Sequence, residues 1–407
     1  MAWGQTRPAS SGPAFDVEAA TDAYLARVPP AEKARSDAYF EGGYWLILWD
    51  YVFGAGISLL LLSTGWSARM RALAERITRR AVLRAMAYWA QYLAAVSLIG
   101  FPWLFYESYL REHQYGLSTQ TFGPWLGDQM KTFGLAVVLG GLALAGLFAV
   151  ARRLPNTWHV WGAVLSMVFV TIGALLAPVF FAPLFNRYTK LADPAVRDPI
   201  LSLARANGIP ASDVYEVDQS RQTTRISANV SGFLGTERIS LNDNLLKRCT
   251  PAEVLAVVGH EMGHYVLHHV YKSLVVFLVV AIVFFSGLRR ALDWFLARWG
   301  TRWGIQGVTD LAVVPLAALV ISTFGLLYTP IGNTVSRVQE YEADLYGLNA
   351  VRQPDAFAEV ALKLADYRKL SPGSIEEWIF YDHPSGRTRI YTAMRWKAEG
   401  GGVENRP

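Results

Sequence analysis

The sequence predicts an α-helical membrane bundle of about six spans that carries a small soluble α+β cap. Of its 407 residues, 52% are hydrophobic and only 17% are charged, a balance typical of membrane proteins. Several apolar segments approach the roughly 20 residues that an α-helix needs to cross a bilayer. A polar insertion in the middle of the chain changes to short helix-like and strand-like patterns, which indicates the cap.

The first 42 residues are expected to form a tail, because they are polar and lack the apolar stretch of a signal peptide. Six apolar segments follow as expected spans, four within residues 43–186 and two within residues 270–332. They are residues 43–64, 85–105, 133–151, 158–185, 271–288 and 311–331. Fourteen tryptophans and nineteen tyrosines suit the two membrane interfaces that flank such spans.

Residues 187–269 form the expected cap. Its patterns predict a helix, a short strand and a pair of strands before the next helix begins. These elements are residues 199–207, 214–217, 225–229 and 238–241. The next helix starts at a capping box made by Thr250 and Glu253, with Pro251 at the first helical position. We expect this helix to continue directly into the fifth span.

Two histidines of this helix, His260 and His264, are four residues apart. They therefore lie on one face, where both imidazoles can reach one Zn²⁺. Glu261 points away from that line and can take a proton from water without binding the metal. The alternative is a helix whose histidines only lie at a membrane boundary. The capped start of the helix favours a zinc site with hydrolytic chemistry.

Two histidines leave a zinc site one protein ligand short. Cys249 is the only cysteine and precedes the helix, so the third ligand is expected to be His, Glu or Asp. Residues 333–407 supply the best candidate. Glu340 and Asp344 share one helix face there, which suits a zinc ligand followed by a carboxylate that orients a ligating histidine. An ordinary charged flank of a membrane span would show the same two residues.

Other polar residues give weaker indications. His383 lies in a turn held by a proline, where it could donate a hydrogen bond to an oxyanion or be a plain surface histidine. His268 and His269 are expected to line the membrane boundary rather than to bind metal. Asp50 lies inside the first apolar segment and should face a cavity or a partner. The net charge of +5 reflects arginines near span ends and gives no sign of nucleic-acid binding.

Further segments, taken together, carry a resemblance to a known family. They are Phe101-Pro102-Trp103, residues 111–116 and 119–123, residues 182–188 and 254–264, Ser336-Arg337 with Glu340 and Ala343-Asp344, and His383-Pro384 with Arg389. On these motifs, which cover most of residues 40–395 in order, the chain resembles the integral-membrane zinc metalloproteases of the type 1 CAAX prenyl endopeptidase family.

The resemblance implies His260, His264 and Glu340 as ligands of one Zn²⁺. It implies Glu261 as general base, with Asp344 matching an aspartate sometimes assigned as a proton donor. It further implies that His383 stabilises the tetrahedral intermediate. The residues that it implies for binding of substrate are Ser227, Ala228, Asn229 and Arg389. The resemblance also implies a water-filled chamber enclosed by the spans.

The expected function is zinc-dependent hydrolysis of peptide bonds, resembling enzymes that remove C-terminal tripeptides from prenylated proteins. The expected partners are a peptide or prenylated protein substrate and the lipid bilayer, with a monomer as the working unit. The alternatives are a quality-control metalloprotease for membrane proteins, a non-catalytic lipid-binding scaffold, and a transporter.

The expected location is a bacterial inner membrane or, in a eukaryote, the endoplasmic reticulum. Two arguments oppose each other on which side the cap faces. Basic residues gather in residues 67–84, 152–153 and 289–302, on the side opposite the cap, and would put the cap outside the cytoplasm. The resemblance puts the cap in the cytoplasm, and we follow the resemblance. The family has seven spans, so one is expected to be missing here.

Overall fold

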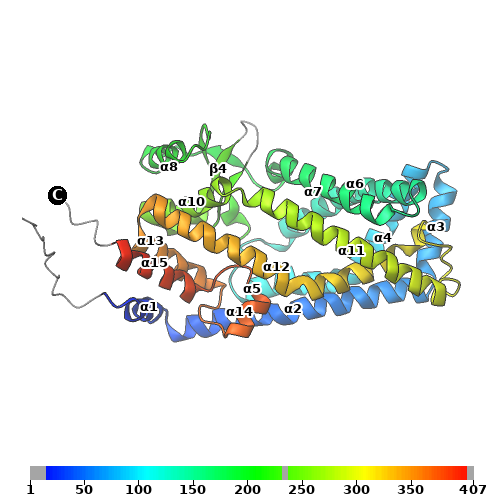
Figure 1. Ribbon diagram of the computed structural model, residues 1–407, viewed down its shortest axis with the longest axis horizontal. Helices are drawn as coiled ribbons and strands as arrows, with labels where there is room; N and C mark the ends of the chain where they lie inside the picture. Colours follow the sequence, from blue (N-terminus) through cyan, green and yellow to red (C-terminus); the bar gives the residue numbers. More distant parts are fainter. Residues whose placement is uncertain (1–14, 232–236, 401–407) are drawn as a thin grey trace, which may run out of the picture.

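Six long apolar helices dominate the computed structural model, which describes residues 15–231 and 237–400. They lie side by side along the long axis of the molecule, and the cap closes one end of the bundle (Figure 1). The helices are α2 (Pro30–Ser63), α4 (Ala81–Phe105), α6 (Phe122–Arg153), α7 (Trp158–Leu176), α11 (His269–Trp299) and α12 (Val314–Val351). The predicted number of spans is confirmed.

Residues 17–42 differ from the expected tail, whereas residues 1–14 lie outside the described residues. Asp16 caps a first helix, α1 (Val17–Leu25), by accepting a hydrogen bond from the backbone N–H of Ala19. The apolar side of α1 packs on the C-terminal helix α15 (Gly386–Gly400). The first turns of α2 then extend the first span toward the cap. The helix can begin at Pro30, because the backbone N–H that proline lacks has no partner at the first helical position.

Shorter helices connect the spans. The basic segment between the first two spans forms α3 (Trp66–Ile77), at the end of the bundle away from the cap (Figure 1). Toward the cap, α4 passes into a π-helical turn and one further helical turn. These and the other short helices outside the cap are η1 (Tyr106–Arg111), α5 (Glu112–Gln114), η2 (Ala177–Phe181), η3 (Ala182–Leu184) and η5 (Leu311–Val313).

The cap contains a four-stranded sheet with the order β1-β2-β4-β3. Its strands are β1 (Tyr188–Lys190), β2 (Val214–Val217), β3 (Ala228–Ser231) and β4 (Arg238–Asn242). β2 and β4 are parallel, β1 is antiparallel to β2, and β3 is antiparallel to β4. Because β3 is last in the strand order, it is an edge strand. The helix α8 (Pro194–Ala206) begins five residues before the expected start because Asp193, rather than a later residue, caps it.

The metal-motif helix is α10 (Pro251–Val266), and its predicted capping box is present. The prediction that this helix runs on into the fifth span is wrong. His268 adopts a left-handed backbone conformation with φ 57°, which ends one helix and starts α11 at His269 in a new direction.

Conversely, the helical segment that carries Glu340 and Asp344 is not a separate helix. It is the continuation of the sixth span within α12, and Pro330 inside the helix does not end it. The rest of the cap consists of short helices. They are η4 (Gln219–Arg221), α9 (Asp243–Arg248), α13 (Pro354–Lys363), η6 (Leu364–Asp366), α14 (Ser374–Phe380) and α15.

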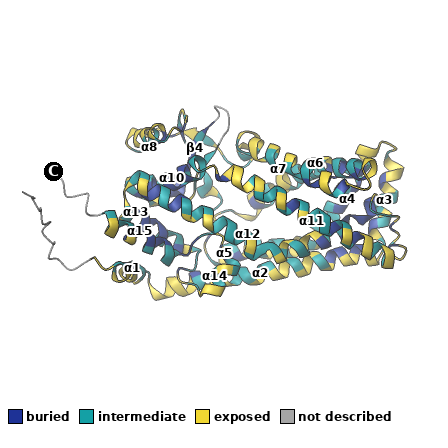
Figure 2. Cartoon of the chain, in the orientation of Figure 1, coloured by how far each residue is buried: buried dark blue, intermediate teal, exposed yellow. Residues whose placement is uncertain are grey.

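Buried apolar side chains gather in the cap and at the far end of the bundle. The outer faces of the long helices are exposed over much of their length (Figure 2). Apolar side chains such as Leu98, Val283 and Leu327 are among the most exposed. Exposed apolar helix faces of this extent suit a lipid environment, in which every backbone group is already satisfied within the helix.

Candidate metal centre

Close contact between α10 and α12 brings the two halves of the centre together. A Cβ atom on Gly347 of α12 would lie 2.8 Å from the backbone nitrogen of His260, and one on Gly263 would lie 3.0 Å from Cα of Ala343. Only glycine leaves room for helix backbones at this separation. The small residues of the motif therefore set the distance between its histidines and the carboxylates of α12.

Three ligand atoms converge where the helices meet. Nε2 of His260 lies 3.2 Å from Nε2 of His264 and 3.2 Å from Oε2 of Glu340. Nε2 of His264 lies 3.4 Å from Oε1 of Glu340. Around tetrahedral zinc, with bonds of about 2.0–2.2 Å, ligand atoms are roughly 3.3 Å apart. Oε2 of Glu340 is buried and receives no hydrogen bond from the described residues. The donor set fits one zinc ion.

Asp344 orients His260 through the ring nitrogen that faces away from the other two candidate ligands. Its Oδ1 accepts a hydrogen bond of 2.7 Å from Nδ1 of His260, which leaves Nε2 free for a metal. Both oxygens of Asp344 also accept hydrogen bonds from Arg389, at 2.6 and 3.0 Å. Burial alone would lower the pKa of His260, but the nearby carboxylates of Asp344 and Glu340 raise it to about 9. The carboxylate of Asp344 is thus fully engaged in orienting its neighbours.

His264 has a second support that the sequence did not reveal. Its Nδ1 lies 2.9 Å from Nδ1 of His269, whose Nε2 lies 3.0 Å from Oε2 of Glu342. Because a carboxylate can only accept, His269 donates from Nε2 and, when neutral, accepts at Nδ1 from His264. That tautomer leaves Nε2 of His264 free for a metal. Lys272 donates to the same carboxylate at 2.7 Å.

Glu261 lines a pocket beside the ligands and is itself only half-buried. Desolvation raises the pKa of its carboxyl, His260 and His264 oppose the rise, and Glu340 adds to it. A carboxyl whose pKa is raised holds a proton more readily than a free carboxylate does, which suits a group that accepts a proton and later returns it.

His383 lies beside the ligands rather than alone on the surface. Its Nε2 is 3.3 Å from Oε2 of Glu340, and its Nδ1 is 2.8 Å from Oδ1 of Asp382. The turn that ends in Pro384 and starts α15 holds it there. Its ring can therefore donate a hydrogen bond toward the pocket.

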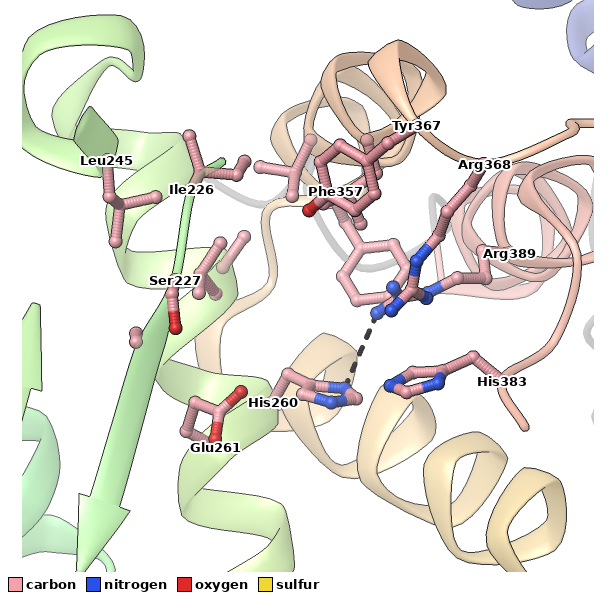
Figure 3. A pocket seen from close by; sticks show the side chains of 15 residues that line it. Ile226, Ser227, Leu245, His260, Glu261, Phe357, Tyr367, Arg368, His383 and Arg389 are labelled. Atoms are coloured by element: carbon pink, nitrogen blue, oxygen red, sulfur yellow. Dashed lines mark hydrogen bonds between the residues drawn. The ribbon is translucent and has the colours of Figure 1, made fainter. Parts of the chain in front are cut away.

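The pocket lies between the edge strand β3, the metal helix and the cap helices, as Figure 3 shows. Ser227 and Ala228 line it, whereas Asn229 does not, because its side chain is exposed on the strand. Arg389 lines the pocket as well, although two of its nitrogens are engaged by Asp344. The remaining walls are mainly apolar. They include Ile226, Leu245, Val257, Phe357, Val360 and Leu364.

A second cavity, of about 660 Å³, lies where the spans meet the cap. Asp50 lines it and accepts a hydrogen bond of 2.6 Å from Nε1 of Trp103, as expected for a carboxylate inside an apolar segment. Arg225 of the cap and Glu112 at the end of the second span also line it. The larger chamber that the resemblance implies stays a prediction.

Comparisons with known proteins agree with these observations. The family model described as peptidase family M48 matches residues 190–397, and the one described as CAAX prenyl protease N-terminal, five membrane helices, matches residues 19–187. Within the described part of residues 19–187, four helices are long and apolar enough to be spans.

Relatives and a solved structure extend this agreement. The uncharacterized metalloprotease YhfN of Bacillus subtilis is 29% identical, over 85% of this chain and 83% of that protein. The CAAX prenyl protease 1 homolog of Arabidopsis thaliana is 29% identical, over 74% of this chain and 72% of that protein. The crystal structure of S. mikatae Ste24p shares the fold, with a TM-score of 0.74 at 20% identity, over 93% of this chain and 95% of that chain.

Proposed function

The chain belongs to peptidase family M48 and is a membrane metalloendopeptidase, and we propose that its metal is zinc, held by His260, His264 and Glu340. The spacing of the three ligand atoms, close to that around tetrahedral zinc, carries this proposal. A bound zinc ion would polarise the scissile carbonyl and lower the pKa of a water molecule.

Protein groups then supply the proton transfers. Glu261 takes a proton from the attacking water and returns it to the leaving amine, for which its raised pKa is suited. His383 donates a hydrogen bond to the oxyanion that develops in the transition state. Asp344 acts as an orienting carboxylate, because His260 and Arg389 already occupy both of its oxygens. Arg389 holds Asp344 and borders the substrate.

The edge strand β3 gives the substrate a place to bind. Its far side has no partner strand among the described residues, and Ser227 and Ala228 border the pocket. An extended peptide can add to such an edge through backbone hydrogen bonds. We assign Asn229 to the same stretch through its backbone.

The substrate class follows from the named relatives. Several are CAAX prenyl proteases, so we propose proteins with a prenylated C-terminal segment, or peptides derived from them, as substrates. We assign the enzyme to a bacterial inner membrane or the endoplasmic reticulum, with the cap in the cytoplasm and a monomer as the working unit. A quality-control protease or a non-catalytic scaffold is not favoured.

Purified protein tests this proposal directly. We expect about one zinc per chain by metal analysis, and cleavage of synthetic peptides detected by mass spectrometry. The matched control is Glu261→Gln, which should keep its zinc and lose turnover by about a hundredfold or more, because the group handles protons without binding the metal. Turnover by Glu261→Gln close to that of the wild type would contradict the proposed role.

A further inference from the structure

Two arginines line the active-site pocket, and their surroundings differ. Arg389 is buried and makes two hydrogen bonds to Asp344, so its charge is neutralised inside the protein. Arg368 has neither a hydrogen bond nor an ion pair with any residue of 15–231 or 237–400. Asp382 is within range of its charge, but that carboxylate is hydrogen bonded to His383 instead. Arg368 thus brings to the pocket a positive charge that no described side chain contacts directly as a hydrogen-bond or ion-pair partner.

The position of Arg368 suits it to meet a substrate. It follows η6 and enters the pocket from the side opposite Ser227 (Figure 3). The neighbouring Tyr367 forms part of the wall. The guanidinium carbon of Arg225 lies over the ring of Tyr367, 5.3 Å from the centre of that ring. A peptide that lies along β3 and past Glu261 would run toward Arg368 on the far side of the pocket.

The shape and lining of the rest of the pocket indicate which kind of chain end would fit. Most of the residues that line it are apolar and its volume is small, about 210 Å³, so it has room for a short stretch of extended chain. Successive residues of such a chain advance by at most about 3.6 Å. An anion that reaches Arg368 from a cut near Glu261 is therefore only a few residues away from the cut. The anion that every peptide carries there is its own C-terminal carboxylate.

We propose that Arg368 binds the free C-terminal carboxylate of the substrate and thereby makes the enzyme select chain ends. This inference rests on the proposed peptidase function and names the residue that sets its specificity. A guanidinium is suited to this role because its parallel N–H groups match both carboxylate oxygens. The apolar walls favour apolar residues next to that carboxylate.

The test uses a set of synthetic peptides of varied sequence, each made with a free C-terminal carboxylate and again as the C-terminal amide. For the wild type, we expect kcat/KM to be about ten- to a hundredfold higher for the carboxylate forms, the range of a charge-assisted hydrogen-bonded pair. Arg368→Gln should cut both forms at about the rate of the amide. Arg368→Lys should retain part of the preference.

Arg395→Gln is the matched control, because it removes the same charge from an exposed residue of α15 outside the pocket. It should keep the wild-type preference. Zinc content is measured for every variant, and if Arg368→Gln does not fold, the wild-type ratio and Arg368→Lys decide. Equal cleavage of both forms by the wild type, or an undiminished preference in Arg368→Gln, would overturn the inference and leave the peptidase function intact. A wild type that cuts neither form would overturn both.

Discussion

At the scale of single residues, each of the two candidate ligand histidines is oriented by a different partner, which contacts its Nδ1 atom. His260 donates to Asp344, which Arg389 anchors, and His264 is supported by His269. Each contact fixes which ring nitrogen faces the metal. Partners of this kind contribute to metal affinity without touching the ion.

Asp344→Asn should weaken zinc binding by roughly ten- to a hundredfold, because an amide holds the Nδ1–H of His260 less firmly and no longer neutralises Arg389. The measurement is zinc affinity by competition with a chelator. Asp355→Asn is the control, because Asp355 is an exposed carboxylate paired with Lys397 on the cap surface. Unchanged affinity with lost turnover would instead assign Asp344 to proton donation.

His383→Phe should lower kcat by about a hundred- to a thousandfold, the usual loss for one donor to an oxyanion. Zinc content should not change, because the proposed ligands are other residues. The relevant data are kcat and bound zinc measured on the same preparation. Normal turnover would show that the contact of His383 with Glu340 has no part in catalysis.

Sequence spacing located the candidate ligands but not all of their supports. His260, His264, Glu340 and Asp344 could be predicted because each pair is four residues apart on a continuous helix. His269 is five residues beyond His264, and on a straight helix it would lie roughly 140° around the axis. The left-handed residue His268 breaks the helix and turns His269 back toward His264. Nothing in the sequence indicates such a conformation at a histidine.

At the scale of elements, the crossing of α10 and α12 determines whether the ligands can meet. Their backbones touch at Gly259, Gly263 and Gly347. The helix starts, the second strand and the approximate spans could be predicted from caps and apolar periodicity. The continuity of α12 through Pro330 could not, because a proline and a change to polar sequence ordinarily indicate a helix end.

Gly347→Ala should separate α10 from α12, because the new methyl group would lie 2.8 Å from a backbone atom that cannot rotate away. We expect a loss of about 1–3 kcal/mol in stability, as is usual for overpacking, together with reduced zinc occupancy. Thermal unfolding in detergent and metal analysis provide the two measurements. Gly134→Ala in α6 is the control, because a Cβ there has no neighbour within 4 Å. Equal behaviour of the two variants would show that the crossing tolerates a side chain.

At the scale of the whole molecule, a small polar cluster joins the cap to the membrane bundle. Arg225, two residues before Ser227, makes an ion pair of 2.7 Å with Glu112 at the end of the second span. Tyr39 of α2 donates to Glu112 at 2.6 Å and accepts from Arg225 at 2.7 Å. The backbone N–H of Thr119 also donates to the carbonyl of Gln222. The candidate substrate strand is thus positioned partly by the spans.

This linkage predicts that stability and activity are coupled through Arg225. Arg225→Gln and Glu112→Gln should each destabilise the protein, and their combination should cost less than the sum. The expected coupling is about 0.5–3 kcal/mol for partners in direct contact. Thermal unfolding of both single variants and the double variant measures it. Because Arg225 precedes β3, Arg225→Gln should also raise KM for peptides, whereas Arg221→Gln, on an exposed 3₁₀ turn of the cap, should not. Additive losses with unchanged KM would mean that the cap holds its substrate strand without help from the bundle.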